Sequence, residues 1–447
     1  MYRPMPAESG FRRADSMVPR FHGREDVTRA AIARDRLHGA ARPIKVFLYS
    51  HDTFGLGHLR RNLAIVDGLL RHQDRFSVHL ITGSPVIRQW SLPPGLSVQP
   101  LPPVVKTGAE RYAARESGKI FGLVKGYREA LILKLVLYHR PDVFLVDHAP
   151  AGMNGELLST LALIRRELPA MRTVLGLRDI LDCPDVVKAL WQEQDIHGLL
   201  DQAYDDVLVY GSEVLFDVAK HYGLTGRIAS RVRYCGYVVA APEARRRHIW
   251  QPDRQVCWDR ARAAGRPVVL VTAGGGGDGY FLMDAYLQSL ARLSVVGFHS
   301  VIVTGPLMAA DEKAALRALA AARPDVELVD HTTNLVPSIE AAHLVVAMAG
   351  YNTSAEILAA RKRAILVPRA APRAEQRMRA NLLDKLGVVH SVEPGPDLVD
   401  RLAALLPVAV AEPPLPDAAW ASLDLNGAER VAEHLLTVAP AMRECVT

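Results

Sequence analysis

A loop of glycines and a histidine near residue 57 has the composition of a ligand-binding turn. Gly55, Gly57 and His58 follow a run of β-branched and aromatic residues and precede the apolar spacing of a helix. Glycines let the backbone approach a ligand, and a helix start offers unpaired N–H groups. A neutral imidazole can accept the proton of a hydroxyl, so His58 is a candidate general base, with helix capping as the structural alternative. The spacing matches neither a P-loop nor G-x-G-x-x-G.

Two further loops could bind a ligand. Four consecutive glycines, Gly274–Gly277, stand between an apolar run and a helical pattern. Their backbone amides could bind a phosphate; a flexible surface loop is the alternative. Further along, Gly350 ends another apolar run, and Glu356 lies in the first turns of the expected helix. A carboxylate there can accept hydrogen bonds from both hydroxyls of a ribose, or it can simply complement the helix dipole.

The elements that must position these loops alternate between strand and helix. Short apolar runs, each generally followed by a loop and a helical pattern, occur at 44–49, 76–81, 143–146, 173–177, 207–210, 268–272, 301–304, 326–329, 344–347 and 364–367. Strands separated by helices indicate parallel sheets covered on both faces. We therefore predict an α/β protein with two Rossmann-like parallel-sheet domains that face a cleft.

Composition sets the boundaries of these domains and excludes several classes of protein. The 447 residues are 49% hydrophobic, but no run of 18 apolar residues predicts a transmembrane helix. The four cysteines are far apart, which argues against a disulfide scaffold or zinc site and fits a cytoplasmic protein. Residues 1–43 hold +4 of the net charge of +6. We interpret them as a largely disordered basic tail, with an arginine-rich targeting segment or a misassigned start codon as the alternatives, and expect no nucleic-acid partner.

Taken together, the three loops resemble those of the GT-B glycosyltransferases, and within them family 28, whose best-known member forms lipid II. The family's G-x5-E element corresponds to Gly350 and Glu356. A proline twelve residues after the glutamate is Pro368, and the paired polar residues that follow are Glu375 and Gln376. The resemblance implies an N-terminal acceptor domain at 44–240, a linker at 241–266, a C-terminal nucleotide-sugar donor domain at 267–436 and a tail at 437–447.

The resemblance also implies roles for particular residues. Glu356 would bind the ribose of the donor, and Glu375 and Gln376 would face the hydroxyls of its sugar. The diphosphate would lie against the glycine loop and the start of the following helix, and the nucleobase would be bound chiefly by backbone groups. The residues concerned are Gly274, Gly275 and Gly276, then Gly350, Asn352 and Thr353, and for the base the stretch from Thr332 to Leu335. The family's glycine-histidine element corresponds to Gly57 and His58.

Some positions depart from the family pattern. Arg61 stands where the family has a proline, and Arg361 and Arg363 replace a glycine and a proline. The form G-x-G-H-x-x-R, with Asp147 and His148 later in the domain, is similar to that of the UDP-sugar hydrolase of pseudaminic acid synthesis. That enzyme shares the fold but passes the glycosyl group to water. Transfer to an acceptor and hydrolysis of the donor are therefore both open.

We predict a transferase that moves a sugar from a nucleotide-diphosphate donor, UDP by resemblance, to an acceptor hydroxyl with inversion. Hydrolysis by water and a non-catalytic nucleotide-sugar-binding protein are the alternatives. His58, or Asp147 paired with His148, would be the base. No D-x-D stands at a suitable strand end, so we expect neither a metal nor a cofactor. The acceptor-side candidates are Gly55, Gly57, Arg61, Arg178 and Asp179.

Two further segments bear on the acceptor. Residues 119–140 combine apolar and basic side chains, as in an amphipathic helix that contacts an anionic membrane surface. Such a helix can equally pack on its own sheet. Residues 101–118 could form a mobile loop over the acceptor side. Peripheral membrane contact of a cytoplasmic protein is thus an additional expectation.

Overall fold

The computed structural model describes residues 42–439 apart from 53–56, 73, 90–91, 109–110, 116–119, 242–264, 331–333 and 372. The predicted tail at 1–43 and linker at 241–266 therefore lie almost wholly outside the described residues, as do residues 440–447. All the elements below belong to the unit that begins at Ile44.

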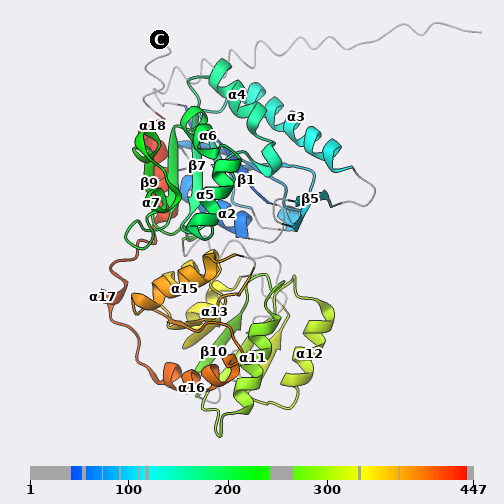
Figure 1. Cartoon of the computed structure of the whole chain (residues 1–447), viewed down its shortest axis with the longest axis vertical. Helices are drawn as coiled ribbons and strands as arrows, with labels where there is room; N and C mark the ends of the chain where they lie inside the picture. The colour runs from blue at the N-terminus through cyan, green and yellow to red at the C-terminus, as the bar shows by residue number, and fades with distance from the viewer. Residues whose placement is uncertain are drawn as a thin grey trace, which may run out of the picture. The chain divides into compact units, whose positions relative to one another are not determined.

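The N-terminal lobe, in which Figure 1 labels β1, β7 and β9, is built on a parallel sheet in the order β3-β2-β1-β6-β7-β8-β9. Its strands are β1 (Ile44–Ser50), β2 (Phe76–Thr82), β3 (Leu96–Pro100), β6 (Val143–Asp147), β7 (Arg172–Arg178), β8 (Asp206–Tyr210) and β9 (Val232–Tyr234). Its helices are α2 (Gly57–Leu70), α3 (Phe121–His139), α4 (Leu158–Glu167), α5 (Pro184–Glu193), α6 (Ile196–Ala203), α7 (Val218–Tyr222) and α8 (Gly226–Ala229), with 3₁₀ turns η1 (Ile87–Gln89) and η2 (Met153–Gly155). The central strands β6 and β8 are buried along their whole length, which explains their continuous apolar sequence.

The C-terminal lobe repeats this design with a parallel sheet in the order β12-β11-β10-β13-β14-β15. Its strands are β10 (Val268–Thr272), β11 (His299–Val303), β12 (Val326–Val329), β13 (Leu344–Ala347), β14 (Ala364–Leu366) and β15 (His390–Ser391). Its helices are α11 (Tyr280–Ala291), α12 (Ala310–Ala320), α13 (Val336–Ala341), α14 (Tyr351–Ala359), α15 (Glu375–Lys385), α16 (Leu398–Ala411) and α17 (Asp417–Trp420). The prediction of two parallel-sheet domains with alternating strands and helices is confirmed.

The last helix, α18 (Gly427–Val438), packs on the N-terminal lobe, where Figure 1 shows it in red beside β9. Gly68 of α2 lies directly against Ala428 of α18. Its buried side chains join one apolar cluster with those of α2 and β1. The sequence-based division at 436 assigns this helix by chain order to the C-terminal domain, whereas its apolar face is buried on the other lobe.

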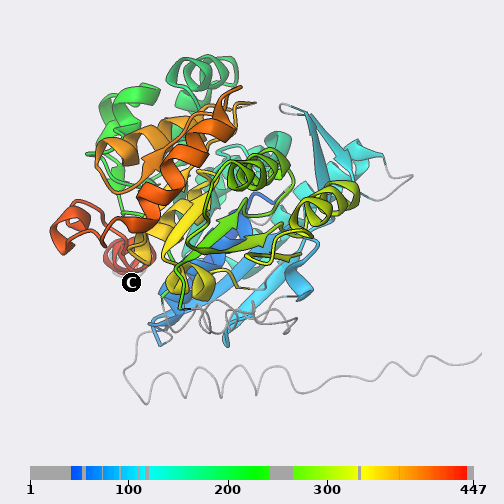
Figure 2. The same ribbon diagram turned by 90° about the horizontal axis from the view of Figure 1, so that it is seen from below.

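Part of the expected mobile loop at 101–118 is a hairpin of β4 (Val104–Gly108) and β5 (Arg111–Ala114), a separate antiparallel sheet seen in cyan in Figure 2. Val104 packs with Val124 of α3 and with Met153 in a small apolar cluster. Because this cluster anchors the hairpin, the described part of the segment has regular structure. The prediction of a mobile loop at 101–118 is therefore wrong for the residues of β4 and β5.

Candidate active site

The cavity between the two sheets has a volume of about 370 Å³ and is lined by both lobes. The N-terminal lobe contributes the start of α2 and the end of β7, and the C-terminal lobe contributes the loops after β10, β11, β13 and β14. Carboxyl ends of parallel strands carry the binding loops in α/β folds. Predicted site residues among the lining are Gly57, His58, Arg61, Arg178, Gly274, Gly275, Leu335, Gly350, Asn352, Thr353, Glu375 and Gln376.

His58 lies in the first turn of α2 and contacts a buried carboxylate. Its Nδ1 is 2.7 Å from Oδ2 of Asp147, which ends β6 and is 1% exposed. Arg61, one turn further along α2, donates from Nη2 to Oδ1 of the same carboxylate at 2.6 Å. Burial raises the pKa of Asp147, but the Arg61 guanidinium and the His58 ring more than offset this and hold it well below the usual range.

The ionised Asp147 therefore fixes the tautomer of His58. A carboxylate can only accept hydrogen bonds, so its contact with Nδ1 favours the tautomer with the proton on Nδ1 and the lone pair on Nε2. Nη2 of Arg61 also lies 3.0 Å from Nδ1, but its contact with Oδ1 of Asp147 is shorter, at 2.6 Å, and takes its proton. A histidine in this state can take a proton from a hydroxyl, and the carboxylate stabilises the imidazolium that forms. Arg61 also lies over the Tyr351 ring, 5.5 Å from its centroid, which further fixes the pair.

The expected pairing of Asp147 with His148 does not occur. Asp147 bonds to His58 and Arg61, whereas Nδ1 of His148 is buried with no hydrogen-bond partner in the described part of the chain. Burial, with the nearby positive charge of Arg178, lowers the pKa of His148 well below its usual range. His148 is neutral and packs its ring 5.0 Å from that of His58.

The tetraglycine loop presents fewer free amides than its sequence suggests. Gly274 donates its N–H to Oγ1 of Thr272 at 3.3 Å, and Gly276 donates to the carbonyl of Ala273 at 3.2 Å. Gly276 has φ +88°, and a Cβ there would lie 2.0 Å from the Thr304 carbonyl oxygen. The turn therefore requires a glycine at position 276. Gly276 itself does not line the cavity. Gly275 lines it, and its N–H has no hydrogen bond to the described residues.

The start of α14 completes this side of the cavity. Gly350 is the N-cap, and the N–H groups of Tyr351, Asn352 and Thr353 precede the first intrahelical bond, from Ser354 to Gly350. Such a helix end favours an anion. Asn352 donates from Nδ2 to the carbonyl of Gly57 at 2.8 Å, so the starts of α14 and α2 meet across the two lobes.

Glu356 faces α2 in this structure. Its Oε1 accepts a hydrogen bond from Arg60, while Oε2 is buried without a hydrogen-bond partner among the described residues. Glu356 is not among the residues that line the cavity. Arg60 does line the cavity, and its ion pair with Glu356 joins the two lobes.

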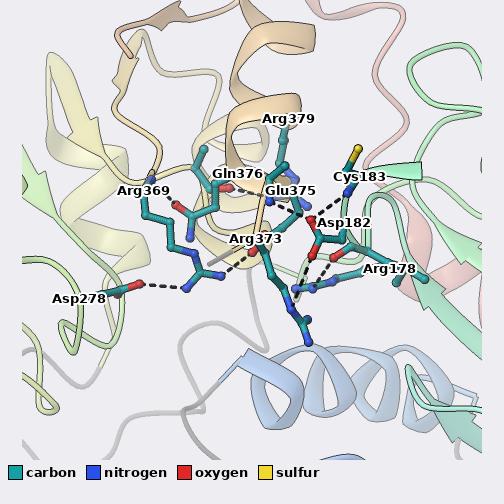
Figure 3. A network of polar contacts seen from close by, with 12 residues as sticks. Arg178, Asp182, Cys183, Asp278, Arg369, Arg373, Glu375, Gln376 and Arg379 are labelled. Carbon is teal, nitrogen blue, oxygen red and sulfur yellow. Dashed lines mark hydrogen bonds and ion pairs between the residues drawn. The ribbon is translucent and has the colours of Figure 1, made fainter. Parts of the chain in front are cut away.

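Glu375 and Gln376 begin α15 and are both buried at the cavity wall (Figure 3). Arg369 donates from Nη2 to Oε1 of Glu375 at 2.6 Å and from its backbone N–H to Oε1 of Gln376 at 3.2 Å. It also reaches Asp278 in the glycine loop at 2.9 Å. Oε2 of Glu375 is buried and has no hydrogen bond within the described ranges, so it can accept one from a ligand hydroxyl.

Asp179 does not face the cavity. It accepts two hydrogen bonds from Arg379 of α15, at 2.8 and 2.6 Å, and both side chains are buried. Its neighbour Arg178 does line the cavity. One residue of the β7–α5 loop therefore binds the lobes together while the adjacent residue faces the ligand space.

Residues 268–404 match the family model described as glycosyltransferase family 28 C-terminal domain. The C-terminal lobe carries a family 28 domain. Solved structures show the same fold over about 90% of the chain. The glycotransferase of kitacinnamycin matches with TM-score 0.59 at 17% identity, over 90% of this chain and 99% of that one. Acinetobacter baumannii MurG matches with TM-score 0.57 at 12% identity, over 89% and 100%. No curated protein sequence matches the chain significantly.

A putative UDP-N-acetylglucosamine 2-epimerase from Listeria monocytogenes matches as well, with TM-score 0.57 at 12% identity, over 91% of this chain and 98% of that one. Identities this low establish the fold, which is GT-B, and leave the reaction to be argued from the site. The family 28 domain supports sugar transfer as the general activity of the enzyme.

Most of the predicted site residues thus line the cavity, together with others that were not predicted. Gly55 and Thr332 lie outside the described residues. Gly276, Asp147, His148, Asp179 and Glu356 are described but do not line the cavity. Lining residues that sequence reasoning missed include Arg60, Asp278, Gly305, Leu307, Tyr351 and Arg369. Gly305 follows an apolar strand, and this position at a strand end could have predicted it as a site residue. Arg60 and Arg369 had no such signal, since their partners are remote in sequence.

Among the described residues, no group of three His, Cys, Asp or Glu side chains is arranged to hold a metal ion. No helix in the described part of the chain has both the length and the apolar composition to cross a membrane.

Proposed function

We propose that the protein transfers a sugar from a nucleotide-diphosphate donor to an acceptor hydroxyl, with His58 as the base. The observation that carries the proposal is the His58–Asp147 pair, in which His58 lines the cavity opposite the family 28 domain and Asp147 is buried behind it. A base held in one tautomer by a buried carboxylate lies across from an anion-binding helix start. Those are the two groups that a displacement at a glycosyl phosphate requires.

The donor would lie along the C-terminal lobe. The N–H of Gly275 and the first turn of α14 would bind its diphosphate, and Oε2 of Glu375 would accept a hydrogen bond from its sugar, with Gln376 beside it. Glu356 would bind the ribose, which requires it to exchange Arg60 for the ribose hydroxyls. UDP is the nucleotide we favour, because structural neighbours include a putative UDP-N-acetylglucosamine 2-epimerase and a UDP complex of S. aureus MnaA.

In the proposed reaction the acceptor oxygen forms a bond to the anomeric carbon as the bond from that carbon to the diphosphate oxygen breaks. Nε2 of His58 takes the hydroxyl proton, and the electron pair of the broken bond leaves with the diphosphate. Attack from the opposite face inverts the configuration. The partial positive charge at the start of α14 stabilises the leaving group, so the proposal includes neither a metal nor a cofactor.

The test is UDP release from UDP-sugars, measured with and without a cell lysate as a source of acceptors. Release only with lysate supports transfer. We expect Glu356→Ala to weaken donor binding and to leave His58 chemistry intact, because a lost hydrogen bond to a charged group costs about 1.5–3 kcal/mol. We expect His58→Ala to bind the donor normally and to turn over about 10²–10⁴-fold more slowly. The reverse pattern would contradict the assigned roles, and binding without turnover in the wild type would favour a non-catalytic protein.

Hydrolysis of the donor is the second candidate. The arginine of the G-x-G-H-x-x-R pattern, Arg61, binds the carboxylate that orients His58, so this departure from the family 28 pattern belongs to the site. Water would then take the place of the acceptor hydroxyl. UDP release from purified protein without lysate would favour this reaction.

We also propose peripheral contact of α3 with an anionic membrane surface on the cytoplasmic side. Leu123, Tyr127 and Tyr138 are exposed, and Lys134 lies exposed on the same helix. Arg128, which the sequence pattern places among the surface cations, is instead buried against Glu156. Binding to phosphatidylcholine vesicles should require phosphatidylglycerol and should be lost in Leu123→Ser/Tyr127→Ser but kept in Val295→Ser, which removes an exposed valine elsewhere.

A further inference from the structure

Arg178 ends β7 at the carboxyl edge of the N-terminal sheet and lines the cavity together with His58 and Glu375. Figure 3 shows it reaching from the N-terminal lobe towards the residues at the start of α15. Its Nη2 donates to the carbonyl of Leu181 at 3.3 Å. Its Nε is buried and has no hydrogen-bond partner in the described part of the chain.

The loop that follows Arg178 is fixed to the opposite lobe. Asp179 is bound by Arg379 through both carboxylate oxygens. Asp182 accepts the backbone N–H of Ala374 at 2.8 Å, and Arg373 lies 4.0 Å from its other oxygen. These contacts hold both ends of the loop. The Arg178 guanidinium is thus preorganised at the cavity wall.

The charge of Arg178 is balanced differently from that of the other arginines around the cavity. Arg60 pairs with Glu356, and Arg61 pairs with Asp147. Arg369 pairs with both Asp278 and Glu375. Arg178 forms no ion pair within the described ranges.

The surroundings of Arg178 favour an additional negative charge. Burial lowers its pKa to about 10; Glu375 opposes this change, while Arg379, Arg373 and Arg61 add to it. A guanidinium taken out of water costs free energy unless an anion compensates it. Its donors form a planar fork that fits the two oxygens of a carboxylate or phosphate.

We infer that Arg178 binds an anionic group, a carboxylate or phosphate, on one of the two substrates. The group would belong to the donor sugar or to the acceptor, and it would lie near His58 and Glu375. The inference rests on the proposed function and narrows its substrates to a donor sugar or an acceptor that carries a negative charge.

The test is calorimetric binding to the full-length protein, with three arms. UDP-glucose and UDP-glucuronate differ only in the carboxylate of the sugar, so their affinity ratio tests the donor. Inorganic phosphate is titrated with and without saturating UDP, which blocks the diphosphate site and leaves an acceptor-side anion site open. The variants are Arg178→Gln, Arg178→Lys and the control Arg227→Gln, an exposed arginine paired with Asp201.

A preference for UDP-glucuronate of about tenfold or more in the wild type, lost in Arg178→Gln, assigns the anion to the donor sugar. Equal donor affinities with about a tenfold loss of phosphate affinity in Arg178→Gln assign it to the acceptor. Arg178→Lys should retain part of either effect, and Arg227→Gln should retain all of it. Melting temperatures of the variants report whether they fold.

If Arg178→Gln changes neither the donor ratio nor phosphate binding, the inference is wrong, while binding of UDP-glucose would still support the proposed function. If no nucleotide sugar binds the wild type, the proposed function is wrong. The phosphate titration without UDP then still decides whether Arg178 binds an anion.

Discussion

At the scale of single residues, the site depends on how Asp147 divides its oxygens between two partners. Oδ2 contacts Nδ1 of His58, and Oδ1 accepts from Arg61. Without the negative charge of Asp147, His58 could adopt either tautomer, and Arg61 would be buried without an ion-pair partner. Under the proposed function, Asp147 is therefore a positioning residue and not the base.

We expect Asp147→Asn to reduce kcat by about 10²–10⁴-fold, because an amide can donate to Nδ1 and so favours the wrong tautomer. Donor affinity should change little, since Asp147 lies on the other lobe. Steady-state kinetics with a calorimetric donor titration measure both. A purely structural role for Asp147 would be indicated by equal losses of kcat and donor affinity.

The matched comparison is His148→Asn. His148 has φ +68°, a conformation that asparagine tolerates better than most residues, and its ring is buried and neutral. We expect turnover within about tenfold of the wild type, since no proton passes through it. A loss as large as that of His58→Ala would mean that His148 is the base after all.

The positions of residues at the cavity were predictable where residue type and spacing carry the signal. His58 and Glu375 stand at motif positions, and both line the cavity. Arg60 was not predictable, because its partner Glu356 lies 296 residues away in the sequence. Arg369 likewise joins Asp278 across 91 residues. Contacts of this kind follow from the packing of whole elements.

At the scale of elements, the apolar runs predicted the central strands, because strands buried on both faces need apolar residues at every position. The edge strands β3, β9 and β15 were not predicted, since β3 is only partly buried, β9 has three residues and β15 has two. The packing of α18 on the N-terminal lobe was also not predicted. Amphipathicity reveals an apolar face but not which sheet covers it.

The contact between α2 and α18 leads to a prediction on two glycines in helices. A Cβ on Gly68 would lie 2.5 Å from the Ala428 carbonyl oxygen, so Gly68→Ala should lower the free energy of unfolding by about 1–3 kcal/mol. A Cβ on Gly126 of α3 would have no atom within 4 Å, and Gly126→Ala should raise the free energy of unfolding by about 0.5–1 kcal/mol. Urea unfolding measures both. Equal effects would show that α18 is not packed closely here.

The pairing of β7 with β8 adds acid sensitivity to the N-terminal sheet. Burial raises the pKa of Asp206, but His434 and Arg172, 3.3 and 2.7 Å from its oxygens, lower it to about 2. A depressed pKa stabilises the fold above the ordinary pKa of an aspartate, and this contribution disappears as the pH falls from about 4 to about 2. Asp206→Asn should therefore lower the free energy of unfolding by about 2 kcal/mol at pH 7 and by progressively less towards pH 2. Asp201→Asn, at an exposed pair, is the control, and a pH-independent difference would contradict the linkage.

At the scale of the whole molecule, the fold class was predictable and the connection between the lobes was not. Two series of alternating strands and helices indicate two parallel sheets with a ligand site at their carboxyl edges. Nothing in the local sequence indicates that Asp179 pairs with Arg379, 200 residues away. This buried pair fixes the loop that follows Arg178 and so couples the stability of the molecule to the geometry of its site.

That pair is the basis of the last prediction. Arg379→Met removes a side chain that is 1% exposed and leaves Asp179 buried without its cation, so we expect a loss of about 3–5 kcal/mol in the free energy of unfolding. The double variant Asp179→Asn/Arg379→Met should lose less than the sum of the two single losses by more than about 1 kcal/mol, because neither charge then remains unpaired. Arg317→Met, at an exposed pair with Asp330, should cost less than about 1 kcal/mol. Additive losses in the double variant would mean that the pair does not join the lobes energetically, and Arg178 would then have to be positioned by the Asp182 contacts alone.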